Sequence, residues 1–425
     1  MQTELLIHRF LEGGNDDLLT DIYVDETKIP YQRDRYINAV KKFEQCYGSG
    51  DVTLFSAPGR SEIGGNHTDH QHGEVLAASV NLDTIGVVKQ TEDNVIRVVS
   101  DSYDEIIIPL DDVSAKEEEK ETTKALIKGV VSGFLERKYA VGGFQAYITS
   151  DVLIGAGLSS SAAFETLIGT ILSGLYNDGK VSSTEIAVIG QYAENIYFGK
   201  PCGLMDQMAS STGNLVHIDF GNPKSPKVEK IDFNMEEYGY RLCITDTKGS
   251  HADLTDEYAA VPKEMKLVAG HFGKEVLRNV SAEEVLKEIY SLRETLGDRC
   301  VLRALHFIRE NERVQKEVAA LKEGNMVAFL ENVRASGDSS FKYLQNVYSN
   351  QDIKNQNVSV ALLVSEMLLG ENGVCRVHGG GFAGTIQAFV KSEYVDSYKK
   401  GMDQVFGKNA CKDLRIRKYG GIKVL

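Results

Sequence analysis

The chain has 425 residues, of which 42% are hydrophobic and 25% charged, the balance of a globular protein with room for two packed lobes. Its formal charge of −14 excludes the broad basic surface that nucleic acids or anionic membranes require. A local phosphate site remains possible, because backbone N–H groups alone can build one.

Cysteine usage and the N-terminal residues indicate a cytoplasmic protein. Residues 1–10 include the acidic Glu4 and lack the charged-then-apolar pattern of a signal peptide. The longest apolar stretch, residues 153–175, is broken by serines and glycines, so it predicts no membrane span. The six cysteines form no CxxC pair, which favours reduced thiols. We expect a monomer that binds neither nucleic acid nor membrane.

The first half of the chain predicts strands and then a strand-loop-helix unit. Residues 52–57 are predicted to form a strand that stops at Pro58-Gly59, and residues 75–80 and 84–88 two further extended segments. Residues 144–149 predict a strand that leads into a glycine turn and a helix. The helix follows from the i, i+3, i+4 spacing of Phe164, Leu167, Ile168, Ile171, Leu172 and Leu175.

A second helix begins with a capping box, Ser182 to Glu185, and stops near Gly199-Lys200-Pro201. Its expected buried face comprises Ile186, Ile189, Ala193, Ile196 and Tyr197. Residues 281–332 are helical in pattern, and residues 374–378 and 385–390 predict two strands joined by glycines. The prediction is therefore an α+β protein.

The segment Gly155–Ala163 lies between the predicted strand and helix. Its glycines let the backbone approach a ligand, and the first helical turn offers unpaired N–H groups and a partial positive charge. Together these features predict an anion site, although a glycine-rich turn with serine caps would look the same. The spacing fits neither a Walker A loop nor a dinucleotide-binding fingerprint.

Four segments together resemble the galactokinases of the GHMP small-molecule kinase family. They are Ala57–His70, the serine loop Gly155–Ala163, Pro201–Gln207 and the glycine-rich Gly379–Gly384. Their order and spacing fit that family from about residue 30 onward. The resemblance implies an N-terminal α/β lobe, a C-terminal ferredoxin-like lobe and an active site in the cleft between them. We expect residues 1–188 in the first lobe and 189–412 in the second, with residues 413–425 returning to pair with the first.

The resemblance also implies roles for single residues. Asp206 matches the catalytic carboxylate, and Arg60 the arginine that keeps it ionised. Ser161 and Glu194 match ligands of the Mg²⁺ that accompanies ATP. The residues expected along the ATP phosphates are Gly155, Gly157, Leu158, Ser159, Ser160, Ser161 and Ala162.

For the sugar, His67, Asp69 and Tyr258 match hydroxyl contacts, and Asn66 and Gly203 belong to the same motifs. Two positions depart from the usual Gly-Glu-His-Thr-Asp-Tyr: Asn66 replaces the glutamate that meets the sugar's 6-hydroxyl, and His70 the tyrosine. We hypothesise that this change either weakens one bond to galactose or admits a sugar altered at position 6, such as galacturonate. The cluster His67, Asp69, His70 and His72 fits no standard zinc signature.

The implied activity is transfer of the γ-phosphoryl group of MgATP to the anomeric hydroxyl of galactose. Rival hypotheses are a galacturonate kinase, a kinase of another GHMP substrate such as an N-acetylated amino sugar or mevalonate, and a non-catalytic sugar and ATP sensor. Pro201–Gln207 favours the galactokinase branch over mevalonate kinases. The intact serine loop, with Asp206 and Arg60 both present, favours an enzyme over a sensor.

Overall fold

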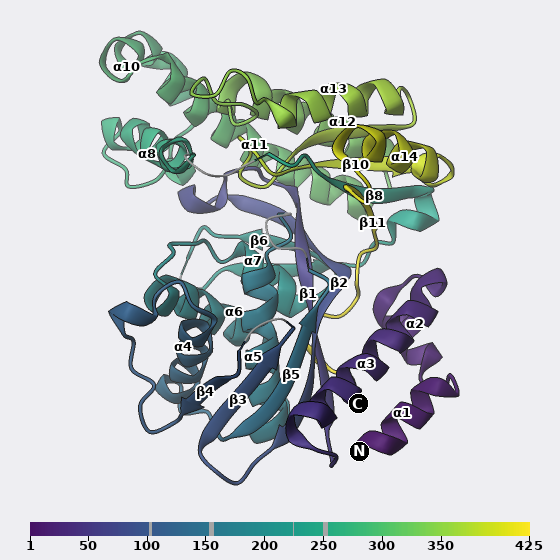
Figure 1. Cartoon of the computed structure of the whole chain (residues 1–425). Coiled ribbons are helices and arrows are strands. Elements are labelled where there is room, and N and C mark those ends of the chain that lie inside the picture. Colours follow the sequence, from purple (N-terminus) through teal and green to yellow (C-terminus); the bar gives the residue numbers. More distant parts are fainter. Residues whose placement is uncertain (102–103, 153–156, 224, 250–253) are drawn as a thin grey trace.

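The computed structural model describes residues 1–101, 104–152, 157–223, 225–249 and 254–425. Within these residues the strands form one sheet of eight and one of four. Each sheet carries its own helices, and the two units stand one above the other in Figure 1. The expected α+β chain in two lobes is confirmed.

The larger sheet has the order β12-β1-β2-β5-β3-β4, and β6 and β7 extend it beside β2. The β3–β5 pair is parallel and the other pairs are antiparallel. The strands are β1 Thr53–Gly64, β2 Glu74–Gln90, β3 Val95–Ser100, β4 Ile106–Pro109, β5 Phe144–Ser150, β6 Leu215–Asp219, β7 Lys227–Ile231 and β12 Ile422–Lys423.

Helices cover both faces of this sheet, because its strands alternate apolar side chains between two cores. On β5, Phe144, Ala146 and Ile148 share a core with α4, α5 and α6, whereas Tyr147 shares a second core with α1, α2 and α3. The helices that pack on this sheet are α1 Thr3–Leu11, α2 Asp16–Tyr23, α3 Ile29–Tyr47, α4 Thr123–Glu136, α5 Ser160–Tyr176, α6 Ser183–Tyr192 and α7 Met205–Thr212.

Strand β1 corrects the prediction that a strand stops at Pro58-Gly59. It continues to Gly64, with a register shift between Pro58 and Arg60. A bulge absorbs the proline, which has no N–H to donate to the ladder. The two segments predicted after it are likewise one strand, β2.

The two predicted helices after β5 are confirmed, including the capping box of Ser182 and Glu185. The second one ends its α-helical part at Tyr192 and continues as a π-helix over Ala193–Phe198, before Gly199 in a left-handed conformation. The wider turn corrects one expectation: Ile196 faces solvent, with 54% of its surface exposed.

The smaller sheet is antiparallel, with the order β11-β8-β10-β9. Its strands are β8 Tyr240–Asp246, β9 Gly373–His378, β10 Thr385–Lys391 and β11 Cys411–Leu414. The helices of this lobe are α8 Thr255–His271, α9 Ala282–Lys287, α10 Ile289–Leu296, α11 Asp298–Lys322, α12 Met326–Ser339, α13 Asn357–Leu369 and α14 Val395–Phe406, with a second π-helix at Ser340–Leu344.

The last described residues return to the first sheet, where β12 pairs with β1. A buried charge cluster holds the preceding segment there. Asp83 accepts bonds from Arg35 Nη1 at 2.5 Å, from Arg417 Nη1 at 2.9 Å and from the Tyr23 hydroxyl at 2.8 Å. Burial alone would raise the pKa of Asp83, but the two arginines lower it below its ordinary value.

The element α7 and the strands β6 and β7 follow residue 188, yet they pack on or pair within the first sheet. The boundary at residue 188 stays a prediction. All six cysteines are free. Among the described residues, no helix combines the length and the apolar character that crossing a membrane would require.

Candidate active site

Arg60 and Asp206 form a bidentate ion pair that joins the first motif to the Pro201–Gln207 segment. Arg60 lies on β1 just after the bulge, and Asp206 in the first turn of α7. Arg60 Nε and Nη2 donate to the two carboxylate oxygens of Asp206, each at 2.7 Å. The Ser159 hydroxyl donates to the same carboxylate at 2.8 Å. The structure thus brings together three residues that are 146 positions apart at most.

This arrangement keeps Asp206 ionised. Burial is the largest influence and would raise the pKa of Asp206, but the Arg60 charge, its hydrogen bonds and that of Ser159 outweigh it and lower the pKa. An ionised carboxylate that retains partial exposure can accept a proton from a hydroxyl placed beside it.

The loop before α5 is described from Gly157 onward. Ser159 (φ 54°) and Gly157 (φ 68°) are both left-handed, and α5 begins at Ser160. The Gly157 carbonyl accepts a bond from Arg60 Nη1, which ties the loop to the ion pair. A Cβ on Gly157 would lie 2.7 Å from Thr385 Oγ1, so only glycine fits there. Leu158 and Ala162 are buried beneath the loop, and Gly155 lies outside the described residues.

Ser161 and Glu194 also meet, as the resemblance implies. The Ser161 hydroxyl donates to Glu194 Oε1 at 3.1 Å, and Lys200 Nζ lies 3.5 Å from the same oxygen. Glu194 is 3% exposed, although a helix glutamate is normally solvated. The Ser161 hydroxyl and the Glu194 carboxylate are hard oxygen donors of the kind that Mg²⁺ prefers.

No group of three His, Cys, Asp or Glu side chains in the described part of the chain is arranged to hold a metal. A divalent cation here would therefore be completed by phosphate oxygens and water, as is usual for Mg²⁺ bound with a nucleotide.

The residues expected at the sugar gather around the glycine-rich loop 379–384. His67 Nε2 lies 3.0 Å from the Gly380 carbonyl, and the Tyr258 hydroxyl donates to the Gly381 carbonyl at 2.7 Å. Asp69 approaches Gly203 so closely that a Cβ on Gly203 would lie 2.1 Å from its Oδ2. Burial raises the pKa of Asp69, and the negative charge of Asp206 acts in the same direction.

Asn66 is fully buried, and protein groups use the whole hydrogen-bonding capacity of its side chain. Its Nδ2 donates to Glu62 Oε1 at 3.1 Å and to the Gly379 carbonyl at 2.7 Å. Its Oδ1 accepts from Ser340 at 3.1 Å and from Asn346 at 2.9 Å. An amide has two hydrogens and two lone pairs, so a sugar contact by Asn66, which stays a prediction, would require one of these bonds to break.

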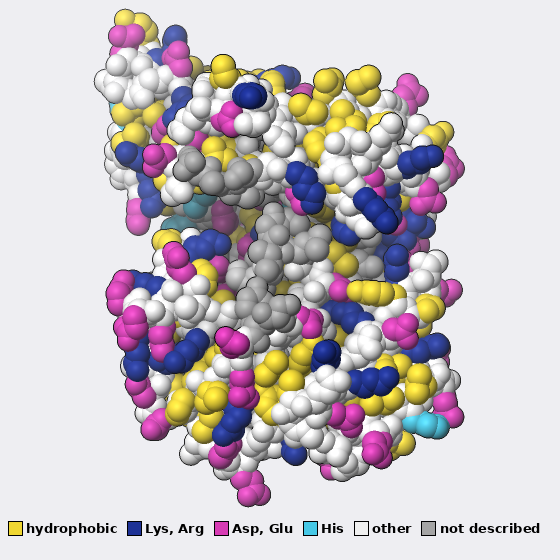
Figure 2. Space-filling view, in the orientation of Figure 1, with side chains coloured by type: hydrophobic (Ala, Val, Ile, Leu, Met, Phe, Trp, Pro, Cys, Tyr) yellow, Lys and Arg dark blue, Asp and Glu magenta, His cyan; other side chains and the backbone are white. Residues whose placement is uncertain are grey.

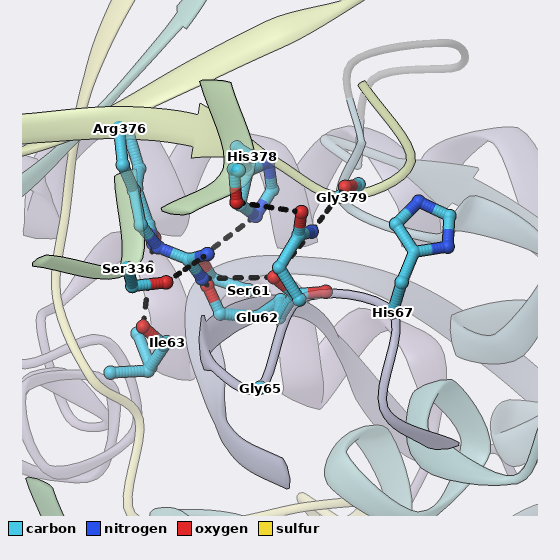
Figure 3. Close-up of polar contacts among 12 residues, drawn as sticks. Ser61, Glu62, Ile63, Gly65, His67, Ser336, Arg376, His378 and Gly379 are labelled. Carbon is cyan, nitrogen blue, oxygen red and sulfur yellow. Dashed lines mark hydrogen bonds and ion pairs between the residues drawn. The ribbon is translucent and has the colours of Figure 1, made fainter. Parts of the chain in front are cut away.

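Figure 3 shows a buried polar network that sequence reasoning missed. His378 joins Ser61 at 3.1 Å and Thr385 at 2.9 Å, and Arg376 donates to Glu62 at 2.9 Å. Burial lowers the pKa of His378, and the nearby Arg60 and Arg376 charges lower it further, so the ring is neutral. One indication of this network was present in the sequence: His378 and Thr385 lie directly before and after the glycine-rich motif. In the space-filling view, the surface is indented between the two lobes (Figure 2).

The chain is similar to known proteins over most of its length. Residues 125–214 match the family described as "GHMP kinases N terminal domain", and residues 41–90 the "Galactokinase galactose-binding signature". A galactokinase of Clostridium tetani is 30% identical over 89% of this chain and 95% of its own length, and one of Actinobacillus pleuropneumoniae 33% identical over 85% and 91%.

Solved structures show the same fold. The galactokinase of Lactococcus lactis complexed with galactose superposes with a TM-score of 0.76 at 25% identity, covering 90% of this chain and 98% of the other. A mevalonate kinase matches with a TM-score of 0.61 at 15% identity over 86% and 99%.

Proposed function

The chain belongs to the galactokinase family of GHMP kinases, and we propose that it transfers the γ-phosphoryl group of MgATP to the anomeric hydroxyl of galactose, giving galactose 1-phosphate. It is a phosphotransferase that acts on a sugar hydroxyl. The observation that carries the proposal is the ion pair of Arg60 with Asp206 beside the serine loop.

In the proposed reaction, Asp206 accepts the proton of the anomeric hydroxyl as that oxygen attacks the γ-phosphorus. Arg60 holds the carboxylate in place and screens negative charge on the moving phosphoryl group. Positioning and electrostatics supply most of the rate in reactions of this kind. The first turn of α5 and Ser159–Ser161 would hold the phosphates, because unpaired N–H groups and hydroxyls gather there.

Ser161 and Glu194 would hold Mg²⁺, which neutralises charge on the phosphates of the bound nucleotide. For the sugar, the candidates are His67 and Tyr258, which contact the 379–384 loop, and Asp69, which lies beside Gly203.

We also expect a cytoplasmic monomer. The six free cysteines support a reducing compartment. Among the described residues on the face in Figure 2, acidic and basic side chains are interspersed rather than gathered by sign, which does not favour a nucleic acid or an anionic membrane.

An assay of ADP release from MgATP, run against galactose, galacturonate, N-acetylgalactosamine and glucose, tests the proposal. Asp206→Asn is expected to lower kcat on galactose by roughly 10²–10⁴-fold, because the proton acceptor is lost. Asp178→Asn is the matched control, since this carboxylate is 82% exposed and lies beyond the far end of α5.

Turnover on galacturonate but not on galactose would show that the proposed substrate is wrong, while the proposed mechanism would still hold. Unchanged turnover in Asp206→Asn would contradict the role of Asp206. Nucleotide binding with no turnover on any sugar would instead favour a sensor.

A further inference from the structure

The amide of Gln207 lies between two buried carboxyl groups. Gln207 follows Asp206 in the first turn of α7 and is fully buried. Its Nε2 donates to Glu194 Oε2 at 2.7 Å and to Glu165 Oε2 at 3.0 Å. A carboxamide nitrogen carries two hydrogens, enough for one short bond to each carboxyl group, and Cys202 Sγ lies farther from the same nitrogen, at 3.7 Å.

The bond from Gln207 determines which oxygen of the Glu194 carboxylate faces Ser161. Gln207 occupies Oε2, and Oε1 is therefore the oxygen that faces the Ser161 hydroxyl and the Lys200 ammonium. Without a donor on Oε2, the carboxylate could rotate about its terminal torsion, which is broad for glutamate. Gln207 thus fixes the orientation of a proposed metal ligand without touching the metal position.

Glu165 supports the amide from the other side. It lies on α5 four residues after Ser161, so the two side chains project from the same helix face. It is 1% exposed, and its Oε1 has no hydrogen-bond partner among the described residues. Burial and the neighbouring Glu194 charge raise the pKa of Glu165, and its Oε2 accepts the second hydrogen of the amide.

We propose that Gln207, braced by Glu165, is a positioning residue that turns Glu194 Oε1 toward the Ser161 hydroxyl, so that the two oxygens form the protein side of the site for the nucleotide's divalent cation. The inference rests on the proposed function. Since Gln207 is the neighbour of Asp206, a single helix turn positions both the proposed base and the proposed metal ligand.

The test is the metal dependence of ADP binding, measured by isothermal titration calorimetry in Mg²⁺ and in EDTA without sugar. Gln207→Met keeps the size of the side chain and removes both bonds. It is expected to weaken MgADP binding roughly tenfold or more, as loss of a bond to a metal ligand does, and to leave ADP binding in EDTA unchanged. The Mg²⁺ concentration that gives half-maximal kcat should rise by a similar factor.

The matched control is Gln387→Met, the same change at a fully buried glutamine of the other lobe. It is expected to leave the Mg²⁺ dependence unchanged. Glu165→Gln retains an acceptor for the amide of Gln207 and should bind MgADP like the wild type. Glu165→Met should weaken it, and this variant carries the test if Gln207→Met does not fold.

Wild-type Mg²⁺ dependence in Gln207→Met would overturn the inference, as would an equal loss of ADP affinity with and without metal. A wild-type protein that binds ADP equally well in Mg²⁺ and in EDTA would overturn the proposed function and this inference with it. A wild-type protein that needs Mg²⁺ while Gln207→Met does not differ from it would overturn this inference alone.

Discussion

The Arg60 guanidinium sets the range of pH over which Asp206 is charged. Burial pushes the pKa of Asp206 upward, and the arginine, with its two bonds of 2.7 Å, reverses that effect. The wild-type carboxylate is therefore ionised at every pH above the ordinary value of about 4. A resemblance to known kinases was enough to predict that Arg60 lies beside Asp206.

Arg60→Met is expected to raise the pKa of Asp206, because burial then acts unopposed by the arginine. The acid limb of kcat/KM, which falls as the carboxylate becomes protonated, should move to higher pH, and kcat should fall by roughly 10²-fold. A pH profile of ADP release checks this. Arg60→Lys keeps the charge and should shift the limb less; an unmoved limb in Arg60→Met would show that Arg60 does not govern Asp206.

Other site residues could not be predicted from the sequence at this scale. Gln207 ends the Pro201–Gln207 segment and His378 precedes the glycine-rich motif, but neither segment shows which partners the two side chains meet: Glu165 for Gln207 and Ser61 for His378. Asn66 is the reverse case, a residue that the sequence singled out but whose side chain is bonded within the protein. Its place in the first motif pointed to the sugar, whereas the folded chain surrounds its amide with four partners.

At the scale of elements, local chemistry predicted the helices better than the strands. The capping box of Ser182 and the apolar spacing of α5 are short-range patterns, and both helices are present. Strand β1 was predicted to stop at Pro58 because proline cannot donate to a ladder. Only its pairing with β2 shows that a bulge carries the strand past it. The π-helix after Tyr192 has no sequence signature either, and it moved Ile196 to the surface.

Ser182→Ala removes the side-chain acceptor of the α6 capping box. The variant is expected to lose about 1 kcal/mol of stability, because the Glu185 N–H loses the oxygen to which it donates at 3.2 Å. Urea unfolding followed by circular dichroism measures the loss, and kcat should not change. Ser183→Ala is the control, because it removes the same hydroxyl group from the next residue, which is not the cap. An equal loss in both variants would mean that the cap contributes nothing specific.

At the scale of the molecule, the Asp83 cluster joins parts of the chain that no local pattern connects. Arg35 comes from α3, Asp83 from β2 and Arg417 from the segment before β12. Asp83 and Arg417 are both completely buried. The return of the last residues was predictable from the resemblance, but the charges that fasten them were not.

Arg417→Met should destabilise the protein by about 3–5 kcal/mol, because Asp83 would keep its burial and lose one of its two cations. Since the wild-type pKa of Asp83 is lowered, its stabilising effect is complete above the ordinary value and is lost only as pH falls through the folded value. The difference in unfolding free energy between wild type and variant should therefore be large at pH 7 and shrink in acid. Lys418→Met, at a residue that is 65% exposed, is the control. A difference that does not depend on pH would contradict this account.

The same cluster constrains the order in which the chain folds. Arg417 follows Asp83 by 334 residues, which a ribosome takes roughly 15–70 s to add. During that interval the interior of the first sheet contains a carboxylate without its second counter-ion, and the edge of β1 that β12 will cover is open. The lobe that is synthesised first is thus among the last to be completed. The edge of β1 is therefore the part of the nascent chain that a chaperone would have to shield for the longest time.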